Sequence, residues 1–134
     1  MKDDCVFCKI ISGLLPSLKV YEEDEYFAFL DIKPLNPGHT LVVPKKHYRF
    51  VDEITDFGGY FEVAKKIGKA IGKATGYKHI YYITLGNMIN HAHIIVFPHF
   101  DGDGHGDDID FNAHKDISES EMKKLASDIR KEVL

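Results

Sequence analysis

The chain has 134 residues, of which 44% are hydrophobic and 12% aromatic, which is enough to fill a core without disulfide bonds. Its formal charge of −4 leaves no basic excess to neutralise a phosphate backbone, so we expect no nucleic acid polymer as a partner. The first residues lack a signal-peptide pattern, and no stretch reaches the ~18 apolar residues of a membrane span. We therefore expect one domain over residues 1–134, located in the cytoplasm and without a membrane partner.

Both cysteines lie in the short motif Cys5-Val6-Phe7-Cys8, at the start of a short amphipathic segment. A redox Cys-x-x-Cys pair follows a strand and opens a helix within a βαβ unit, whereas this pair begins the chain. Half of a tetrahedral zinc site is therefore favoured, and the eight histidines are the obvious source of two further ligands. A redox pair, or two thiols that bind nothing, remain as alternatives.

Runs of β-branched and aromatic residues, bounded by turn residues, predict strands along most of the chain. In chain order these runs cover residues 18–21, 26–30, 39–43, 80–85 and 91–97. The acidic turn 22–25 makes a hairpin of the first two runs. A turn cluster at 34–38 precedes the third run, and a tight connection at 86–90 precedes the fifth.

Apolar residues recur at three- and four-residue spacing over residues 55–74, which predicts one long amphipathic helix. Glycine costs a helix about 1 kcal/mol relative to alanine, so we expect its glycines to mark a frayed first turn or a close approach to a neighbour. These glycines are Gly58, Gly59, Gly68 and Gly72. A capping box at 118–121 opens a last helix, and the polar segment 100–116 before it is expected to be a mobile surface loop.

The fifth run opens with two histidines, His91 and His93, separated by one residue. Because side chains alternate along a strand, both imidazoles are expected on one face, roughly 7 Å apart. Burial of two imidazoles is costly unless a metal, a hydrogen-bond network or an anionic substrate engages them. Such a pair alone is more often structural or metal-binding than nucleophilic.

Several blocks of residues, in this order and at these separations, resemble the histidine triad (HIT) family. The blocks are Cys5-x-x-Cys8, the run FLDI at 29–32, the run GHTLVVPKKH at 38–47, and His91-Ala-His93 leading to Phe97-Pro98. The match spans residues 5–98, which we take as the motif-bearing core, followed by a C-terminal loop and helix over 99–134. The resemblance implies an α+β fold, with a five-stranded antiparallel sheet, one long helix and a C-terminal helix, and a homodimer.

The resemblance also implies a substrate class, namely nucleotides with a leaving group on the α-phosphate. Nucleoside phosphoramidates, nucleotidyl anhydrides and dinucleoside polyphosphates are examples, and we expect a purine nucleotide. A neutral imidazole displaces the leaving group, and water then hydrolyses the nucleotidyl-histidine. Carried over by position, His93 is the nucleophile, and His39 lines the same pocket and orients the phosphate or the nucleophile's ring.

Further contacts to the nucleotide are carried over in the same way. They are Asp31 at the ribose hydroxyls, Phe7, Phe29 and Ile32 around the base, Asn87 or Asn90 at a phosphate oxygen, and His99 in place of a usual arginine. The zinc ligands of family members that keep the Cys-x-x-Cys pair match Cys5, Cys8, His47 and His91. Two thiolates and two imidazoles form a closed structural zinc site, with no open position for metal catalysis.

Two departures from the family pattern bear on activity. The third place of the triad, usually histidine, is Ile95, which cannot donate a hydrogen bond to a phosphate. The connection at 86–90 is also shorter than in relatives, which removes donors from the side of the leaving group. Two functions follow: a hydrolase or nucleotidyl transferase that uses His93, or a non-catalytic HIT domain that binds nucleotide or a protein partner. The retention of His93 with His39 and Asp31 favours the enzyme.

Overall fold

The computed structural model describes residues 2–105 and 108–133. Its elements, in chain order, are α1 (Val6–Ile11), β1 (Lys19–Glu22), β2 (Tyr26–Leu30), β3 (Thr40–Pro44), a 3-10 turn (Val51–Glu53), α2 (Phe57–Thr75), β4 (His79–Thr84), β5 (Ile94–His99) and α3 (Glu119–Glu132). No helix among the described residues combines the length and the apolar character that a bilayer crossing requires.

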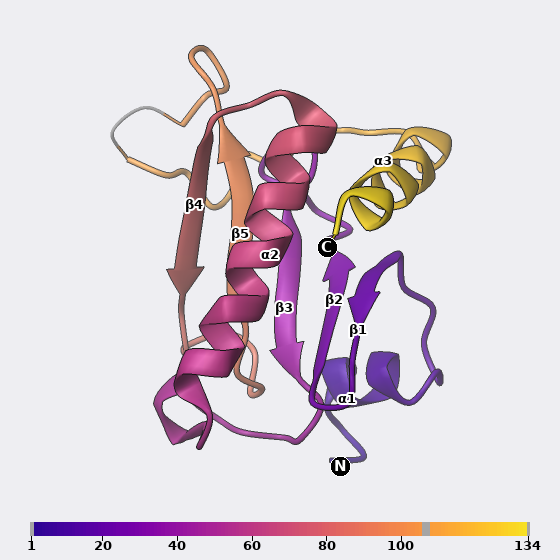
Figure 1. Ribbon diagram of the computed structural model, residues 1–134, viewed down its shortest axis with the longest axis vertical. Helices are drawn as coiled ribbons and strands as arrows, with labels where there is room; N and C mark the ends of the chain where they lie inside the picture. Colours follow the sequence, from indigo (N-terminus) through magenta and orange to yellow (C-terminus); the bar gives the residue numbers. More distant parts are fainter. Residues whose placement is uncertain (1, 106–107, 134) are drawn as a thin grey trace.

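The five strands form one antiparallel sheet in the order β1-β2-β3-β5-β4, which confirms the predicted α+β fold (Figure 1). Each predicted strand is present; β2 has the predicted ends, and the ends of the other four are shifted by one to three residues. The largest shift is in β5, which begins at Ile94 rather than at His91. Ala92 precedes the strand, and its N–H donates to the carbonyl oxygen of Tyr48, 2.7 Å away. The two histidines therefore lie in the approach to the strand.

The central strands β2, β3 and β5 are buried on both faces, which explains why they read as continuous apolar runs. Helix α2 crosses one face, and α3 packs against α2 and β1 on the same side (Figure 1). Alternate residues of β2, such as Ala28, contact this layer, whereas Phe27 and Phe29 lie on the opposite face. There they pack with α1 and its two cysteines. The candidate site is built on this second face.

The helix ends and glycines agree with the pattern in the sequence. Asp56 caps α2 by accepting a hydrogen bond from the N–H of Gly59, and Ser118 caps α3 in the same way. A Cβ atom on Gly68 would overlap the hydroxyl of Tyr82 on the neighbouring strand β4. Close approach of α2 to the sheet is therefore the reason for a glycine at this position.

The prediction of a mobile surface loop at 100–116 is wrong for Asp103 and His105, whose side chains are buried. They turn inward and pack behind the connection between β2 and β3. Residues 106 and 107 of the predicted loop lie outside the described residues. The low hydrophobicity of this segment thus reflects buried polar contacts at these two positions rather than exposure.

Candidate functional site

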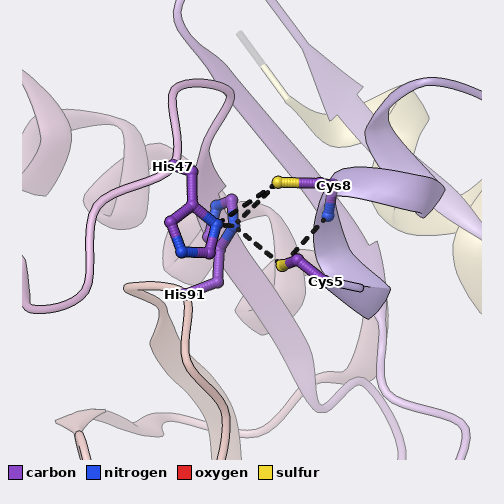
Figure 2. Close-up of side chains that lie close together, drawn as sticks. All are labelled: Cys5, Cys8, His47 and His91. Carbon is purple, nitrogen blue, oxygen red and sulfur yellow. Dashed lines mark hydrogen bonds between the residues drawn. The ribbon is translucent and has the colours of Figure 1, made fainter. Parts of the chain in front are cut away.

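Four predicted metal ligands lie together at the end of the sheet that bears α1 (Figure 2). Cys5 caps α1, its sulfur accepting a hydrogen bond from the N–H of Cys8 one turn later. His47 follows β3, and His91 precedes β5. The short helix thus brings two sulfurs to face two imidazoles from neighbouring strand ends.

The ligand atoms fit a tetrahedral metal ion. The Nδ1 atom of His91 lies 3.4 Å from Cys5 Sγ and 3.5 Å from Cys8 Sγ. That of His47 lies 3.4 Å from Cys8 Sγ and 3.1 Å from His91 Nδ1. A zinc ion at its usual bond lengths separates sulfur and nitrogen ligands by about 3.5 Å, so these spacings match it. The cluster can therefore hold a divalent metal with no ligand position left open.

The orientation of His91 is fixed from behind the cluster. Its Nε2–H donates to the carbonyl oxygen of Pro44 at 2.8 Å, which leaves the lone pair of Nδ1 directed at the sulfurs. Burial lowers the pKa of His91 to about 4, so the ring is neutral at physiological pH and able to bind a metal.

His93 lies next to this cluster and is also buried. Its Nδ1 is 2.9 Å from the carbonyl oxygen of His91, and because a carbonyl can only accept, Nδ1 carries the proton. The lone pair of the neutral ring is then on Nε2. Burial lowers the pKa of His93, which keeps the ring in this neutral form. Both histidines touch the ring of Phe7 edge-on, so they do face one side, as predicted.

A cavity of about 370 Å³ opens beside His93. Five of the predicted site residues line it, namely Phe7, Phe29, Asp31, Ile32 and His93. The rest of its lining comes from α1 and the connection that follows it, and from the sheet; it consists of Val6, Ile10, Leu15, Pro16, Ser17, Leu30, Leu41, Ile89 and Ile95. Most of the wall is apolar, and the lining contains one carboxylate and no lysine or arginine. The cavity therefore suits a flat apolar group beside a polar, uncharged one.

Asp31 and His39 form a pair at the edge of this cavity. His39 Nδ1 accepts a hydrogen bond from the N–H of Leu35 at 3.0 Å, so Nε2 carries the proton, and this nitrogen lies 3.6 Å from Asp31 Oδ2. The other oxygen of Asp31 accepts from the N–H of Lys33 at 2.8 Å. Burial lowers the pKa of His39 to about 4, against the opposing effect of the Asp31 charge. His39 is not among the residues that line the cavity, so it stands behind Asp31 rather than beside it.

Three predicted nucleotide contacts lie away from the cavity. Asn87 and Asn90 are exposed, and Asn90 lines a smaller cavity of about 230 Å³ that is also lined by Cys5 and His47. His99 donates from Nδ1 to Asp103 at 2.8 Å and stacks on the ring of Tyr81. The structure does not bring these three side chains to His93.

Some lining residues were missed by the sequence reasoning. Ile10 lies three residues after Phe7, and this helical spacing could have placed both on one face of α1. Leu15, Pro16 and Ser17 gave no such signal, because they belong to an irregular connection.

Comparisons with known proteins agree with this geometry. A model of the HIT domain matches residues 13–102. A HIT-like protein of Methanocaldococcus jannaschii is 39% identical, covering 90% of this chain and 96% of its own length. An adenosine 5'-monophosphoramidase of Schizosaccharomyces pombe is 31% identical, covering 96% of this chain and 98% of its own.

The fold is also similar to that of a solved structure. A Zn-bound histidine triad family protein from Mycobacterium smegmatis matches with a TM-score of 0.82 and 25% identity, covering 97% of this chain and 93% of that one. Together with the domain model and the relatives above, this similarity shows that the chain belongs to the histidine triad (HIT) family.

Proposed function

We propose that this protein is a nucleotide hydrolase that cleaves the bond between the α-phosphate and its leaving group. The substrates are nucleoside phosphoramidates or dinucleoside polyphosphates, and the reaction proceeds through a nucleotidyl-histidine on His93. The adenosine 5'-monophosphoramidase of S. pombe supports this reaction class, because the chain covers 98% of that relative at 31% identity. The observation that carries the proposal is the neutral His93 ring beside the cavity, with its free lone pair on Nε2.

In the first step, His93 Nε2 attacks the α-phosphorus, and the bond from phosphorus to the amine or phosphate leaving group breaks. The leaving group takes the electron pair of that bond, and an amine also takes a proton from the solvent. The ring becomes positively charged, and its Nδ1–H donates more strongly to the carbonyl oxygen of His91. Water then attacks the same phosphorus and gives up a proton to the solvent. The bond between phosphorus and Nε2 breaks, which releases the nucleoside monophosphate and returns His93 to its neutral form. The hydrogen bond to His91 keeps the correct nitrogen unprotonated throughout.

The remaining lining residues bind the nucleotide. The rings of Phe7 and Phe29 meet edge-to-face with centroids 5.5 Å apart, and with Ile32 they form an apolar slot for a purine base. Asp31 accepts hydrogen bonds from the ribose hydroxyls, and His39 positions Asp31 from behind.

The metal in this proposal is zinc, held by Cys5, Cys8, His47 and His91. When bound, it cross-links α1 to the ends of β3 and β5 and supplies no Lewis acid to the reaction, because its four positions are filled. We further propose that the protein is a homodimer in the cytoplasm, where both thiols stay reduced.

A second function is favoured by one specific feature, the apolar wall at Ile95. Without a cation or a third histidine in the lining, the cavity offers little stabilisation of the charge that develops on the phosphate. A HIT domain that binds nucleotide or a protein partner with little or no turnover fits this wall.

Incubation with adenosine phosphoramidate, guanosine phosphoramidate and a dinucleoside polyphosphate separates the two functions. The wild type is expected to release nucleoside monophosphate and to form a trappable phosphohistidine adduct, and His93→Ala is expected to do neither. His79→Ala, a change at an exposed histidine on β4, serves as the matched control and is expected to keep full activity. Nucleotide binding without release by the wild type would instead identify a non-catalytic domain.

A further inference from the structure

The connection between β2 and β3 carries Asp31 at its start and His39 at its end, and the chain after β5 holds it in place. The carbonyl oxygen of Lys33 accepts from His114 Nδ1 at 2.9 Å, and that of Pro34 accepts from the N–H of Lys115 at 2.8 Å. The carbonyl oxygen of Leu35 accepts two hydrogen bonds, each of 3.1 Å, from His105 Nε2 and Lys115 Nζ. Three successive peptide groups of the connection are thus tied to residues about 70 to 80 positions later in the chain.

Asp103 anchors these contacts from a buried position. Its carboxylate accepts from the N–H groups of Phe100 and His105, from His99 Nδ1, and from Asn36 Nδ2 at 2.8 Å. The Lys115 ammonium also donates to the main-chain oxygen of Asp103. A buried carboxylate with this many donors is a rigid point of attachment. We call Asp103, His105, His114 and Lys115 the C-terminal clamp.

The clamp residues lie beyond the part of the chain that the HIT domain model matches, which ends at residue 102. Their side chains do not line the cavity beside His93. The shortest route from the clamp to His39 runs through the Leu35 peptide group, whose oxygen is held by the clamp and whose N–H donates to His39 Nδ1 at 3.0 Å. From His39, Nε2–H faces Asp31 Oδ2.

We propose that the C-terminal clamp positions Asp31 and His39 and thereby sets the affinity of the cavity for nucleotide. His105 and Lys115 are positioning residues that act through the carbonyl oxygen of Leu35. The contacts of the clamp are seen in the structure, whereas its effect on nucleotide affinity rests on the function proposed above.

Opening the clamp would free the connection between β2 and β3. The Leu35 oxygen accepts two hydrogen bonds, so loss of either donor leaves one bond unmade inside the protein, and the connection moves to let water take its place. The Leu35 N–H then no longer holds the Nδ1 acceptor of His39, so the imidazole turns and its Nε2–H no longer faces Asp31 Oδ2. Asp31 and the apolar slot would still be present, but their positions relative to His93 would no longer be fixed. Binding is weakened more than the chemical step.

Three variants and one control test the proposal. Lys115→Met keeps the aliphatic stem and removes both ammonium contacts, and His105→Leu removes the ring donor. His105→Gln retains an N–H donor where Nε2 was, so it is expected to rescue. Lys124→Met is the matched control, because it makes the same chemical change at an exposed ammonium of α3 that bonds only to Asp128 within that helix.

The first readout is amide hydrogen exchange of Leu35, compared with the Val42 amide of β3 to correct for changes in global stability. We expect exchange of Leu35 to become about tenfold faster in Lys115→Met and His105→Leu, and to stay at the wild-type rate in His105→Gln and Lys124→Met. Unchanged Leu35 exchange in the first two variants would overturn the clamp, whatever the protein does with nucleotides.

The second readout is the dissociation constant of adenosine monophosphate by calorimetry, with KM and kcat for adenosine phosphoramidate. Lys115→Met and His105→Leu are expected to raise the dissociation constant and KM about five- to tenfold and to change kcat less than twofold. Faster Leu35 exchange with unchanged nucleotide binding would overturn the positioning role. Absence of nucleotide binding in the wild type would refute the proposed function, while the exchange data would still decide on the clamp.

Discussion

The main-chain oxygen of His91 accepts the Nδ1–H of His93 at 2.9 Å, while the imidazole of the same His91 lies among the sulfurs of Cys5 and Cys8. One residue therefore joins the metal cluster to the proposed nucleophile. Any change that moves His91 also moves the acceptor that selects the tautomer of His93.

Removal of the metal is expected to destabilise the protein and to disturb His93. A closed site of two thiolates and two imidazoles contributes its binding free energy to folding. We expect one zinc per chain by elemental analysis, and a fall in melting temperature of roughly 10 °C or more on addition of a strong chelator. The Cys8→Ser variant should melt at this lower temperature whether or not chelator is present.

Absence of bound metal, with no response to chelator, would favour two thiols that bind nothing. Reactive thiols of low pKa would instead favour a redox pair.

Replacement of Ile95 by histidine is expected to raise turnover. Ile95 lines the cavity, two residues from His93 along β5, and a ring at this position could donate to a phosphate oxygen. Loss of a preorganised donor commonly lowers the rate by about 10² to 10³, so we expect the donor introduced by Ile95→His to recover a part of this and increase kcat by about tenfold. Burial of a polar ring in the apolar wall should lower the free energy of unfolding by about 1–3 kcal/mol.

Leu41→His is the control for this change, because Leu41 pairs with Ile95 across the sheet and lines the same cavity. It should cost similar stability without a gain in kcat. Equal or lower kcat in Ile95→His, measured with adenosine phosphoramidate, would show that the third position does not limit the reaction.

The part of the site that could be predicted is the part built from regular elements. Phe29 on β2 and Asp31 just beyond it are two residues apart, so strand alternation places both on the cavity side. The His91-Ala-His93 spacing likewise gave the two imidazoles a common side, although β5 starts later than expected. The local pattern was sufficient because the two residues of each pair are separated by a single residue, so the extended backbone between them sets the side on which both lie.

The rest depends on contacts between distant parts of the chain. Asp103 and His105 have the composition of a surface loop, and their bonds to Asn36 and Leu35, about 70 residues earlier, help to make their burial favourable. His99 was predicted at the phosphate but lies six residues beyond His93 on an extended strand, which is roughly 20 Å of chain. Strand spacing could have excluded His99 from the phosphate, whereas no local signal in the sequence reports the long-range bonds of Asp103 and His105.

A pair of glycine substitutions in α2 tests the close approach of this helix to the sheet. Gly68→Ala should not show the gain in stability usual for alanine in a helix, because the added methyl group would overlap the hydroxyl of Tyr82 and the ring of this exposed residue would have to move. Gly58→Ala, in the first turn of the same helix, meets open space and should stabilise it by about 0.5–1 kcal/mol. Urea unfolding of both variants checks this, and an equal gain in stability from both would mean that Tyr82 does not pack on Gly68.

His39 is expected to contribute measurably to the pH dependence of the free energy of unfolding. Burial lowers its pKa to about 4, whereas an unfolded histidine titrates near pH 6.5. Between these values the unfolded chain binds a proton that the folded chain does not, so the free energy of unfolding falls as pH drops from about 6.5 to about 4. Above pH 6.5 neither state is protonated, and this contribution is fully present. Its size over the whole window is roughly 3 kcal/mol.

His39→Asn isolates this share, since the asparagine amide oxygen can still accept the Leu35 N–H but does not titrate. Urea unfolding at a series of pH values should give a flatter curve for His39→Asn than for the wild type between pH 6.5 and 4, with no difference in slope above pH 7. His91 titrates in both proteins and therefore cancels in the comparison. If His39→Asn kept the wild-type slope, His39 would have to be protonated in the folded protein, and Asp31 rather than burial would control its charge.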